Sequence, residues 1–394
     1  MRLAVAALLV LFGCDAPSTL YRRDVAPILA THCVQCHRER GDAPFALDTF
    51  ARTASRAREI AHATAQRRMP PWPIGTPDGC PPVLGRRGLS PDEITTLSRW
   101  WLEGAEEGSG PLPPPPPTPE DALERVDLVV QPAAGYVPRP REDDYRCFLV
   151  DPGLTEDQFV TAFAVRPEVP GIIHHLLAFS VDTAEAEAAL RPLAEAEDGP
   201  GFDCAVFPEV SVRYVTVWSP GDPVRRHPAG SGLRLRAGRP LLLQVHYHDH
   251  GMALPDRPAI ELELTRNVEL EAMVWSMAAV LVLPPGQARV QASGGRGPLD
   301  GTYRIWGARP HMHGLGRSVR IDVRSEGQDA CVMSLDRWDA AVQPMYFLDA
   351  PVVAGPGSEI RVTCTYDTTS RNTPTFWGWG TADEMCFAHV YVTR

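Results

Sequence analysis

The sequence predicts a multidomain protein in which a small all-α domain precedes two all-β, jelly-roll-like sandwiches. Three features predict this order. Residues 15–107 show helical apolar spacing, residues 108–122 are rich in proline, and residues 123–394 contain short β-branched and aromatic runs between Pro, Gly and Asp. A length of 394 residues suits this number of domains. The net charge of −11 argues against nucleic acid as a partner.

The first 14 residues are typical of an export signal. Arg2 precedes the apolar run Leu3–Phe12, which is too short to span a bilayer. Leu11-Phe12-Gly13-Cys14 is similar to a bacterial lipobox, which predicts that Cys14 becomes the lipidated first residue. Phe12 is unusual there, so secretion without a lipid is the alternative. We expect an exported, periplasmic or outer-surface lipoprotein in a compartment that permits disulfides.

A helix is predicted over Tyr21–Arg40, and it contains Cys33-Val34-Gln35-Cys36-His37. The pattern C-x-x-C-H is the attachment signature of a c-type haem, in which two thioethers hold the porphyrin and the histidine ligates iron. A disulfide or a zinc knuckle is the alternative reading. Zinc would need a second ligand pair nearby, and the sequence offers none.

The rest of this segment agrees with a small haem protein. Phe50–Arg68 predicts a second helix, and Met69 on the following proline-rich loop is the expected sixth iron ligand, with His62 as the competitor. Methionine ligation suits electron transfer. A capping box, Ser90–Glu93, predicts the start of a third helix that ends at Gly104. The segment is similar to a class I cytochrome c in helix order and motif spacing.

A stiff polyproline spacer, Pro113–Pro117, separates the predicted domains. The sandwiches are then expected at residues 123–267 and 268–394. Thr183–Glu197 is expected to form a surface helix or a long loop. The strands are predicted at Phe159–Val165, Val212–Trp218, Leu241–His246, Ile260–Leu264, Val274–Leu283, Gly301–Trp306, Ser318–Val323 and Glu359–Tyr366.

The strands carry candidate metal ligands. His311 and His313 lie two residues apart on an extended segment, so both side chains point to one face and could share a metal ion. A pair of surface histidines is the alternative reading for this motif taken alone. Further imidazole and thioether groups are supplied by His174, His175, His246 and Met385, with His248 and His250 as competitors of His246.

In this order the motifs resemble those of the copper type II, ascorbate-dependent monooxygenases. The resemblance covers the chain from about Cys147 to its end. It is carried by His174-His175 in an apolar run, by Leu243-Gln-Val-His-Tyr247, by Arg309-x-His-x-His-x-Leu-Gly316 and by Asp383-Glu-Met-Cys386.

The resemblance implies two copper sites of different chemistry. His174, His175 and His246 would hold one copper ion, and His311, His313 and Met385 would hold the other. Imidazole binds copper in either oxidation state, whereas a thioether favours Cu(I). Gln244 would lie near the first copper. Arg309 occupies the position of a carboxylate-binding arginine.

The resemblance also implies disulfides Cys147–Cys204 and Cys364–Cys386. Cys80 and Cys331 remain, either as a bridge between domains or as two thiols. The sequence departs from the amidating members of the family. Phe387 and His389 stand where those members place an asparagine and a tyrosine, which favours an apolar-walled site over peptide amidation.

These features predict a copper-dependent monooxygenase that hydroxylates a C–H bond of an unknown small or peptide-like substrate with O2. A haem in the same chain suggests that electrons from a periplasmic donor reach copper through the haem instead of from ascorbate. One alternative is a non-catalytic periplasmic copper and haem lipoprotein that transfers electrons or binds copper. A copper oxidase that makes peroxide is a further alternative.

Overall fold

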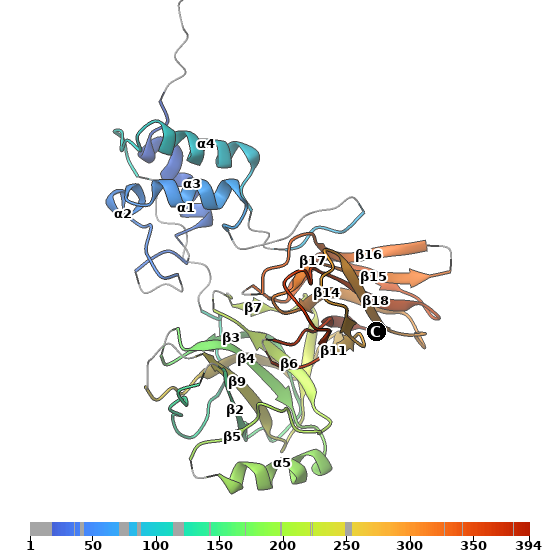
Figure 1. Ribbon diagram of the computed structural model, residues 1–394. Coiled ribbons are helices and arrows are strands. Elements are labelled where there is room, and N and C mark those ends of the chain that lie inside the picture. Colours follow the sequence, from blue (N-terminus) through green and yellow to red (C-terminus); the bar gives the residue numbers. More distant parts are fainter. Residues whose placement is uncertain are drawn as a thin grey trace, which may run out of the picture. The chain divides into compact units, whose positions relative to one another are not determined.

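The computed structural model divides the chain into two compact units (Figure 1). The helical unit comprises residues up to Pro70 together with Gly88–Pro117, and the sandwich unit comprises Pro71–Arg87 together with Thr118–Arg394. The residues that the structure describes are 18–34, 36–39, 43–70, 79–84, 88–112, 122–141, 143–169, 171–197, 199–220, 222, 224–248, 254–326, 328–340, 342–380 and 382–394. The predicted lipidation site Cys14 and the spacer Pro113–Pro117 lie outside them.

The helical unit contains a short π-helix, η1 (Tyr21–Val25), and four α-helices: α1 (Ala26–His32), α2 (Phe50–Ala54), α3 (Ala57–Ala65) and α4 (Pro91–Leu102). Its core joins the first and last helices, because Tyr21 packs on Trp100 with ring centroids 5.9 Å apart. Ser90 caps α4 and Glu93 completes the capping box, as predicted. Gly104 follows α4 with φ = 101°, which favours glycine.

Two predicted helices are shorter in the structure. The helix predicted at Tyr21–Arg40 ends at His32, so the C-x-x-C-H motif follows the helix instead of lying within it. The helix predicted at Phe50–Arg68 is divided into α2 and α3 at Ser55 and Arg56. Local apolar spacing continues across both breaks, which is why the sequence did not reveal them.

The sandwich unit is built from three sheets and a small ribbon. A nine-stranded sheet has the order β1-β10-β3-β8-β11-β20-β14-β17, with β7 also paired to β3. A five-stranded sheet has the order β5-β2-β9-β4-β6, a four-stranded sheet has the order β13-β18-β15-β16, and β12 pairs with β19. One helix, α5 (Ala184–Ala196), confirms the expected helix at Thr183–Glu197.

The strands have the following bounds: β1 (Leu128–Val130), β2 (Asp143–Val150), β3 (Gln158–Arg166), β4 (Ile173–Ser180), β5 (Phe202–Asp203), β6 (Arg213–Trp218), β7 (Arg225–Arg226), β8 (Ser231–Leu235), β9 (Leu241–His248), β10 (Ala259–Thr265), β11 (Leu270–Ala278), β12 (Val282–Leu283), β13 (Val290–Arg296), β14 (Tyr303–His311), β15 (Gly316–Ser325), β16 (Gln328–Leu335), β17 (Tyr346–Ala354), β18 (Glu359–Tyr366), β19 (Thr375–Phe376) and β20 (Phe387–Thr393).

The nine-stranded sheet continues through both predicted sandwiches. β8 and β11 pair in parallel and join its two halves, and β10 and β11 lie on either side of the expected boundary at residue 267. Each half of the sandwich unit has its own hydrophobic core. Phe163 of β3 and Leu243 of β9 belong to one core, whereas Ile321 of β15 and Val390 of β20 belong to the other. The two predicted sandwiches therefore form one compact unit whose two largest cores lie one in each half.

A short strap, residues 79–84, comes from between α3 and α4 in the sequence but packs in the sandwich unit. Cys80 forms a disulfide with Cys331 of β16. Val83 is buried, and the backbone N–H of Leu84 donates to the carbonyl of Phe347 on β17 at 2.8 Å. The two cysteines whose state the sequence left open thus form a disulfide. Both lie in the sandwich unit, although the sequence placed residues 15–107 in one helical domain.

In the part of the chain that the structure describes, no helix is long and apolar enough to cross a membrane.

Candidate metal centres

The first cluster joins two neighbouring strands of the five-stranded sheet. β4 carries His174 and His175, and β9 carries His246, which stands opposite His175 in the strand register. The Nδ1 atom of His174 lies 3.1 Å from Nδ1 of His175 and 3.2 Å from Nδ1 of His246. One ligand atom from each of the three side chains lies within 4.8 Å of the others.

This donor set fits a copper ion. An ion about 2.0–2.1 Å from each imidazole nitrogen would span the observed separations of the Nδ1 atoms. Burial lowers the pKa of His175 well below its usual range, and the positive charges of nearby histidines lower it further. The imidazole is therefore neutral at physiological pH, which is the form that binds metal ions.

A hydrogen bond and a ring contact fix the imidazole of His246. Its Nε2 atom lies 2.8 Å from a carboxylate oxygen of Asp143, on β2. Its ring stacks on Tyr145 with centroids 4.1 Å apart and an interplanar angle of 9°. Because Asp143 accepts the Nε2 proton, Nδ1 of His246 keeps its lone pair and faces the other two histidines.

Asp143→Asn is expected to lower the copper affinity of the first cluster by about 10–100-fold, because an amide orients the imidazole less strongly and makes it a weaker base. Titration of the Cu(I) protein against a chelator of known affinity would measure the change. Asp151→Asn, at an exposed turn after β2, serves as the matched control and should leave the affinity unchanged. Equal affinity in the wild type and Asp143→Asn would show that this carboxylate does not support a metal ligand.

The second cluster lies at the end of β14. His311 is the last residue of this strand and His313 follows in the adjoining turn, with ring centroids 5.1 Å apart. The Nδ1 atom of His311 is bonded to the side-chain oxygen of Gln343, and Nδ1 of His313 lies 3.0 Å from the carbonyl of Asp383. Both acceptors fix the proton on Nδ1, so each Nε2 atom keeps a lone pair for a metal ion. Burial lowers the pKa of His311 to about 3, which keeps its ring neutral.

Glu384 ties the histidine turn to Met385. Its fully buried carboxylate accepts hydrogen bonds from the backbone N–H of His313 at 2.8 Å, of Leu315 at 2.6 Å and of Met385 at 3.2 Å. The carbonyl of Met385 accepts a hydrogen bond from the hydroxyl of Tyr366 at 2.7 Å. The backbone of Met385, which is buried, is thus tied through Glu384 to the turn at His313. Two imidazoles and a thioether would fit Cu(I).

Arg309 is a buried cation near both clusters. Its Nε–H donates to the carbonyl of Gln343 at 2.6 Å, and among the described residues no carboxylate forms an ion pair with it. Burial lowers the pKa of Arg309, and its charge in turn lowers the pKa of both His175 and His311. An unpaired buried cation is costly. Asp222 lies within electrostatic range of Arg309 and raises its pKa, but this carboxylate forms its ion pair with Arg225. The Arg309 guanidinium can therefore bind an anionic group.

Two other predicted residues lie in different surroundings. The amide of Gln244 donates to the carbonyl of Cys204 at 3.4 Å and makes no hydrogen bond to the three histidines. Gln244 lies two residues before His246 on β9, so its role near the first cluster stays a prediction. His389 stands opposite Arg309 in the strand register, stacks on Tyr214 and bonds the hydroxyl of Ser276 at 3.0 Å. Its ring also contacts Phe387 edge to face, with ring centroids 4.7 Å apart. The side chains of His248 and His250 lie outside the described residues.

The structure contains the disulfides Cys147–Cys204 and Cys364–Cys386, the two pairs that the family resemblance implies. The first joins β2 to the segment after β5. The second joins β18 to the residue that follows Met385, so it fixes one side of the candidate ligand.

The haem-attachment motif lies just after α1. Cys33 and Cys36 form no disulfide. His37 is buried, and its Nδ1 lies 2.9 Å from the carbonyl of Phe45, which accepts the proton and leaves Nε2 as a possible iron ligand. Met69 is 40% exposed, and His62 is exposed and contacts Trp101. The orientation of His37 fits an axial ligand.

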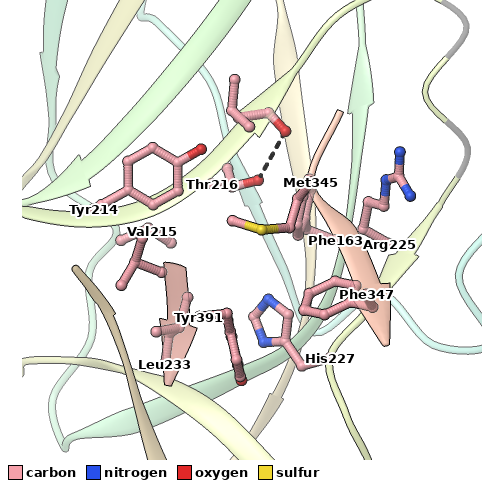
Figure 2. Close-up of a pocket in the computed structure, with 12 residues that line it drawn as sticks. Phe163, Tyr214, Val215, Thr216, Arg225, His227, Leu233, Met345, Phe347 and Tyr391 are labelled. Carbon is pink, nitrogen blue, oxygen red and sulfur yellow. Dashed lines mark hydrogen bonds between the residues drawn. The ribbon is translucent and has the colours of Figure 1, made fainter. Parts of the chain in front are cut away.

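A separate pocket lies between strands of the nine-stranded sheet and β6 (Figure 2). It contains His227, whose Nδ1 lies 2.8 Å from the carbonyl of Val160 and whose ring packs near Phe347 and Tyr391. Burial lowers the pKa of His227 from its usual value to about 4. The folded protein therefore holds this ring neutral, whereas the unfolded chain takes up a proton near pH 6.5.

This difference predicts acid destabilisation of the sandwich unit. Stability from neutral His227 is present above about pH 6.5 and is lost as the pH falls towards 4, by about 2–3 kcal/mol. His227→Asn keeps a donor for the Val160 carbonyl and does not titrate, so its unfolding temperature should fall less between pH 7 and pH 4. Calorimetric melts of both proteins would measure this, and identical pH profiles would contradict it.

The family comparison matches residues 273–393 to "Copper type II ascorbate-dependent monooxygenase, C-terminal domain". This segment runs from β11 to β20 and contains His311, His313 and Met385.

Three curated proteins are similar to this chain in sequence. MOXD1 homolog 1 of Drosophila melanogaster is 26% identical over 194 residues, which are 45% of this chain and 28% of the relative. Dopamine beta-hydroxylase of Canis lupus familiaris is 25% identical over 203 residues (46% and 32%). Tyramine beta-hydroxylase of Caenorhabditis briggsae is 23% identical over 195 residues (45% and 33%). The chain thus spans about a third of the length of these curated relatives. The part of the sandwich unit that carries the second cluster is therefore related to the copper type II ascorbate-dependent monooxygenases.

Proposed function

We propose that this chain is a copper-dependent monooxygenase that hydroxylates a C–H bond of a small or peptide-like substrate with O2. The observation that carries the proposal is the cluster of His174, His175 and His246, together with a second pair, His311 and His313, whose turn is bonded through Glu384 to the backbone of Met385. The two donor sets would differ in chemistry, since only the second would include a thioether. A protein that only stores copper needs no such difference. The similarity to dopamine and tyramine beta-hydroxylases supports the same reaction class.

The groups around each cluster would preorganise its histidines for binding copper. Asp143, Gln343 and the carbonyl of Asp383 each fix the tautomer of one histidine before metal arrives. Glu384 holds the turn at His313 against Met385, which limits the reorganisation on binding. When bound, copper supplies one-electron chemistry with O2, and the thioether site favours the reduced ion.

The substrate would bind near Arg309. Its buried guanidinium lies in electrostatic range of both clusters and has no carboxylate partner among the described residues, so it can hold an anionic group. The aromatic wall made by Phe387, His389 and Tyr214 suits an apolar substrate body. Together they favour a substrate with an apolar part and one negative charge.

We also propose that Cys33 and Cys36 carry a c-type haem with His37 as one axial ligand and Met69 as the other. The hydrogen bond from His37 to Phe45 supports the axial role, because it directs Nε2 away from the backbone. In this proposal electrons from a periplasmic donor reach the copper sites through the haem, and a lipid on Cys14 anchors the protein to a membrane.

A stopped-flow experiment tests the electron path. Pre-reduced full-length protein would be mixed with O2, with and without copper, and the haem absorption bands would be followed beside His313→Ala. Fast haem oxidation that requires both copper and His313 is expected. Oxidation that is independent of copper would contradict haem delivery, and a reduced haem that persists while ascorbate supports turnover would leave ascorbate as the donor.

The second candidate is a non-catalytic copper and haem lipoprotein, favoured by the haem-attachment motif Cys33–His37. Product analysis under ¹⁸O2 separates the candidates. A monooxygenase places one labelled atom in an organic product, an oxidase places the label in peroxide, and a carrier places it in neither.

A further inference from the structure

An exposed apolar surface lies on the small ribbon of β12 and β19 and on the turn that follows it. It consists of Val280, Val282, Phe376, Trp377 and Trp379, here named the ribbon patch, whose side chains are 96%, 61%, 56%, 39% and 49% exposed. Trp377 and Trp379 contact each other edge to face with ring centroids 5.5 Å apart. Contiguous exposed apolar side chains of this size mark binding surfaces.

The ribbon is apolar on both faces. Leu281, Leu283 and Thr375 point inward and are buried. Val282 stands opposite Phe376 in the register, and both point outward. A strand with one solvated face normally alternates apolar and polar side chains. Core packing explains the inward residues, but it does not explain the outward ones.

No charged residue belongs to the patch itself, and Arg371 and Asp383 lie at its edge, where they bond the carbonyl of Ala382 and the N–H of Gly380. Residues 278–288 and 372–382 contain no Asp, Glu, Lys, Arg or His, in a chain whose net charge is −11. Protein interfaces usually combine aromatic residues with arginine and a polar rim. Tryptophan, phenylalanine and aliphatic side chains without charges are instead typical of segments that enter the boundary between lipid headgroups and acyl chains.

We propose that the ribbon patch docks the sandwich unit on the surface of a neutral, zwitterionic lipid bilayer. The sequence contains the lipobox-like Leu11-Phe12-Gly13-Cys14, so a lipid surface is a partner that we also expect from this motif. A measurable contact of the patch with lipid would add to the attachment that a lipid on Cys14 provides. The large negative charge disfavours anionic lipid.

Docking would set the position of the second metal cluster. The backbone N–H of Gly378 donates to the carbonyl of Glu384 at 3.3 Å, and the N–H of Glu384 donates to the carbonyl of Phe376 at 3.1 Å. The patch is therefore directly bonded to the residue before Met385. Insertion of Trp377 and Trp379 into the headgroup layer would bring this cluster to the membrane surface.

The test uses full-length protein with Cys14→Ser, so that no acyl chain contributes, and sedimentation with phosphatidylcholine vesicles. We expect partitioning that falls by at least about tenfold in Trp377→Ser/Trp379→Ser, because insertion depends on buried aromatic area. Trp377→Phe/Trp379→Phe should retain most of it. The matched control is Leu193→Ser/Val206→Ser, which removes exposed apolar side chains elsewhere on the sandwich unit and should have no effect.

Three outcomes would overturn the proposal: no vesicle binding, equal binding by the serine double variant, or binding only when phosphatidylglycerol is added. If the ribbon patch instead binds another protein, no vesicle binding is expected. Near-ultraviolet circular dichroism of each variant shows whether the fold is kept. The assay needs neither copper nor turnover, so its result is independent of the proposed catalytic function.

Discussion

Glu384→Ala is expected to destabilise the sandwich unit by about 3–5 kcal/mol and to empty the second metal cluster. The substitution leaves three buried backbone N–H groups, of His313, Leu315 and Met385, without their acceptor. Each buried donor that loses its partner costs about 1–3 kcal/mol, with some recovered by relaxation. Calorimetry should show a drop of roughly 5–15 °C in Tm, and metal analysis should show the loss of one of two copper ions.

Two further variants make this result interpretable. Glu384→Gln keeps one acceptor oxygen and should give an intermediate loss of stability. Glu359→Gln removes a half-exposed carboxylate that pairs with Arg361 on β18, and such pairs contribute about 0–1 kcal/mol. Unchanged Tm and copper content in Glu384→Ala would show that the buried carboxylate does not join the histidine turn to Met385.

Removing the two clusters separately is expected to remove one copper ion each time. His174→Ala/His175→Ala should empty the first cluster and spare the second, and His311→Ala/His313→Ala should do the reverse. The clusters lie on different sheets with different supporting residues, so their losses should be nearly independent. Each affinity should fall by more than the roughly 10–100-fold that loss of a supporting residue causes.

His227→Asn is the control for these double variants, because it replaces a buried histidine that belongs to neither cluster and should retain both copper ions. Copper would be counted by elemental analysis after dialysis. Loss of both ions in either double variant would indicate one shared site, and loss of none would indicate that the histidines do not bind copper.

The sequence revealed the elements whose signals are local. Phe159–Val165 is a short run rich in β-branched and aromatic residues, and β3 covers it as Gln158–Arg166. Ser90 and Glu93 form a capping box that can be read from four residues. The apolar run Val274–Leu283 was predicted as one strand but is two, β11 and β12, because a continuous apolar run hides the break between Ala278 and Val282.

The supporting residues of the candidate site could not be predicted, because tertiary contacts choose them. Asp143 alternates with Tyr145 and Cys147 on β2, a weak signal that becomes meaningful only when β2 pairs with β9. Gln343 lies in a loop without periodicity, 32 residues after the histidine it supports. The Cys80–Cys331 disulfide spans 251 residues, and no sequence rule fixes such a pairing.

The most direct test of two chemically different copper sites is copper K-edge X-ray absorption on the Cu(I)-loaded full-length protein. We expect two copper ions per chain and one sulfur neighbour for every two coppers, with the sulfur signal absent in Met385→Leu. A wild-type spectrum with nitrogen and oxygen neighbours alone, or a sulfur signal that persists in Met385→Leu, would contradict the assignment of Met385 to the second copper site.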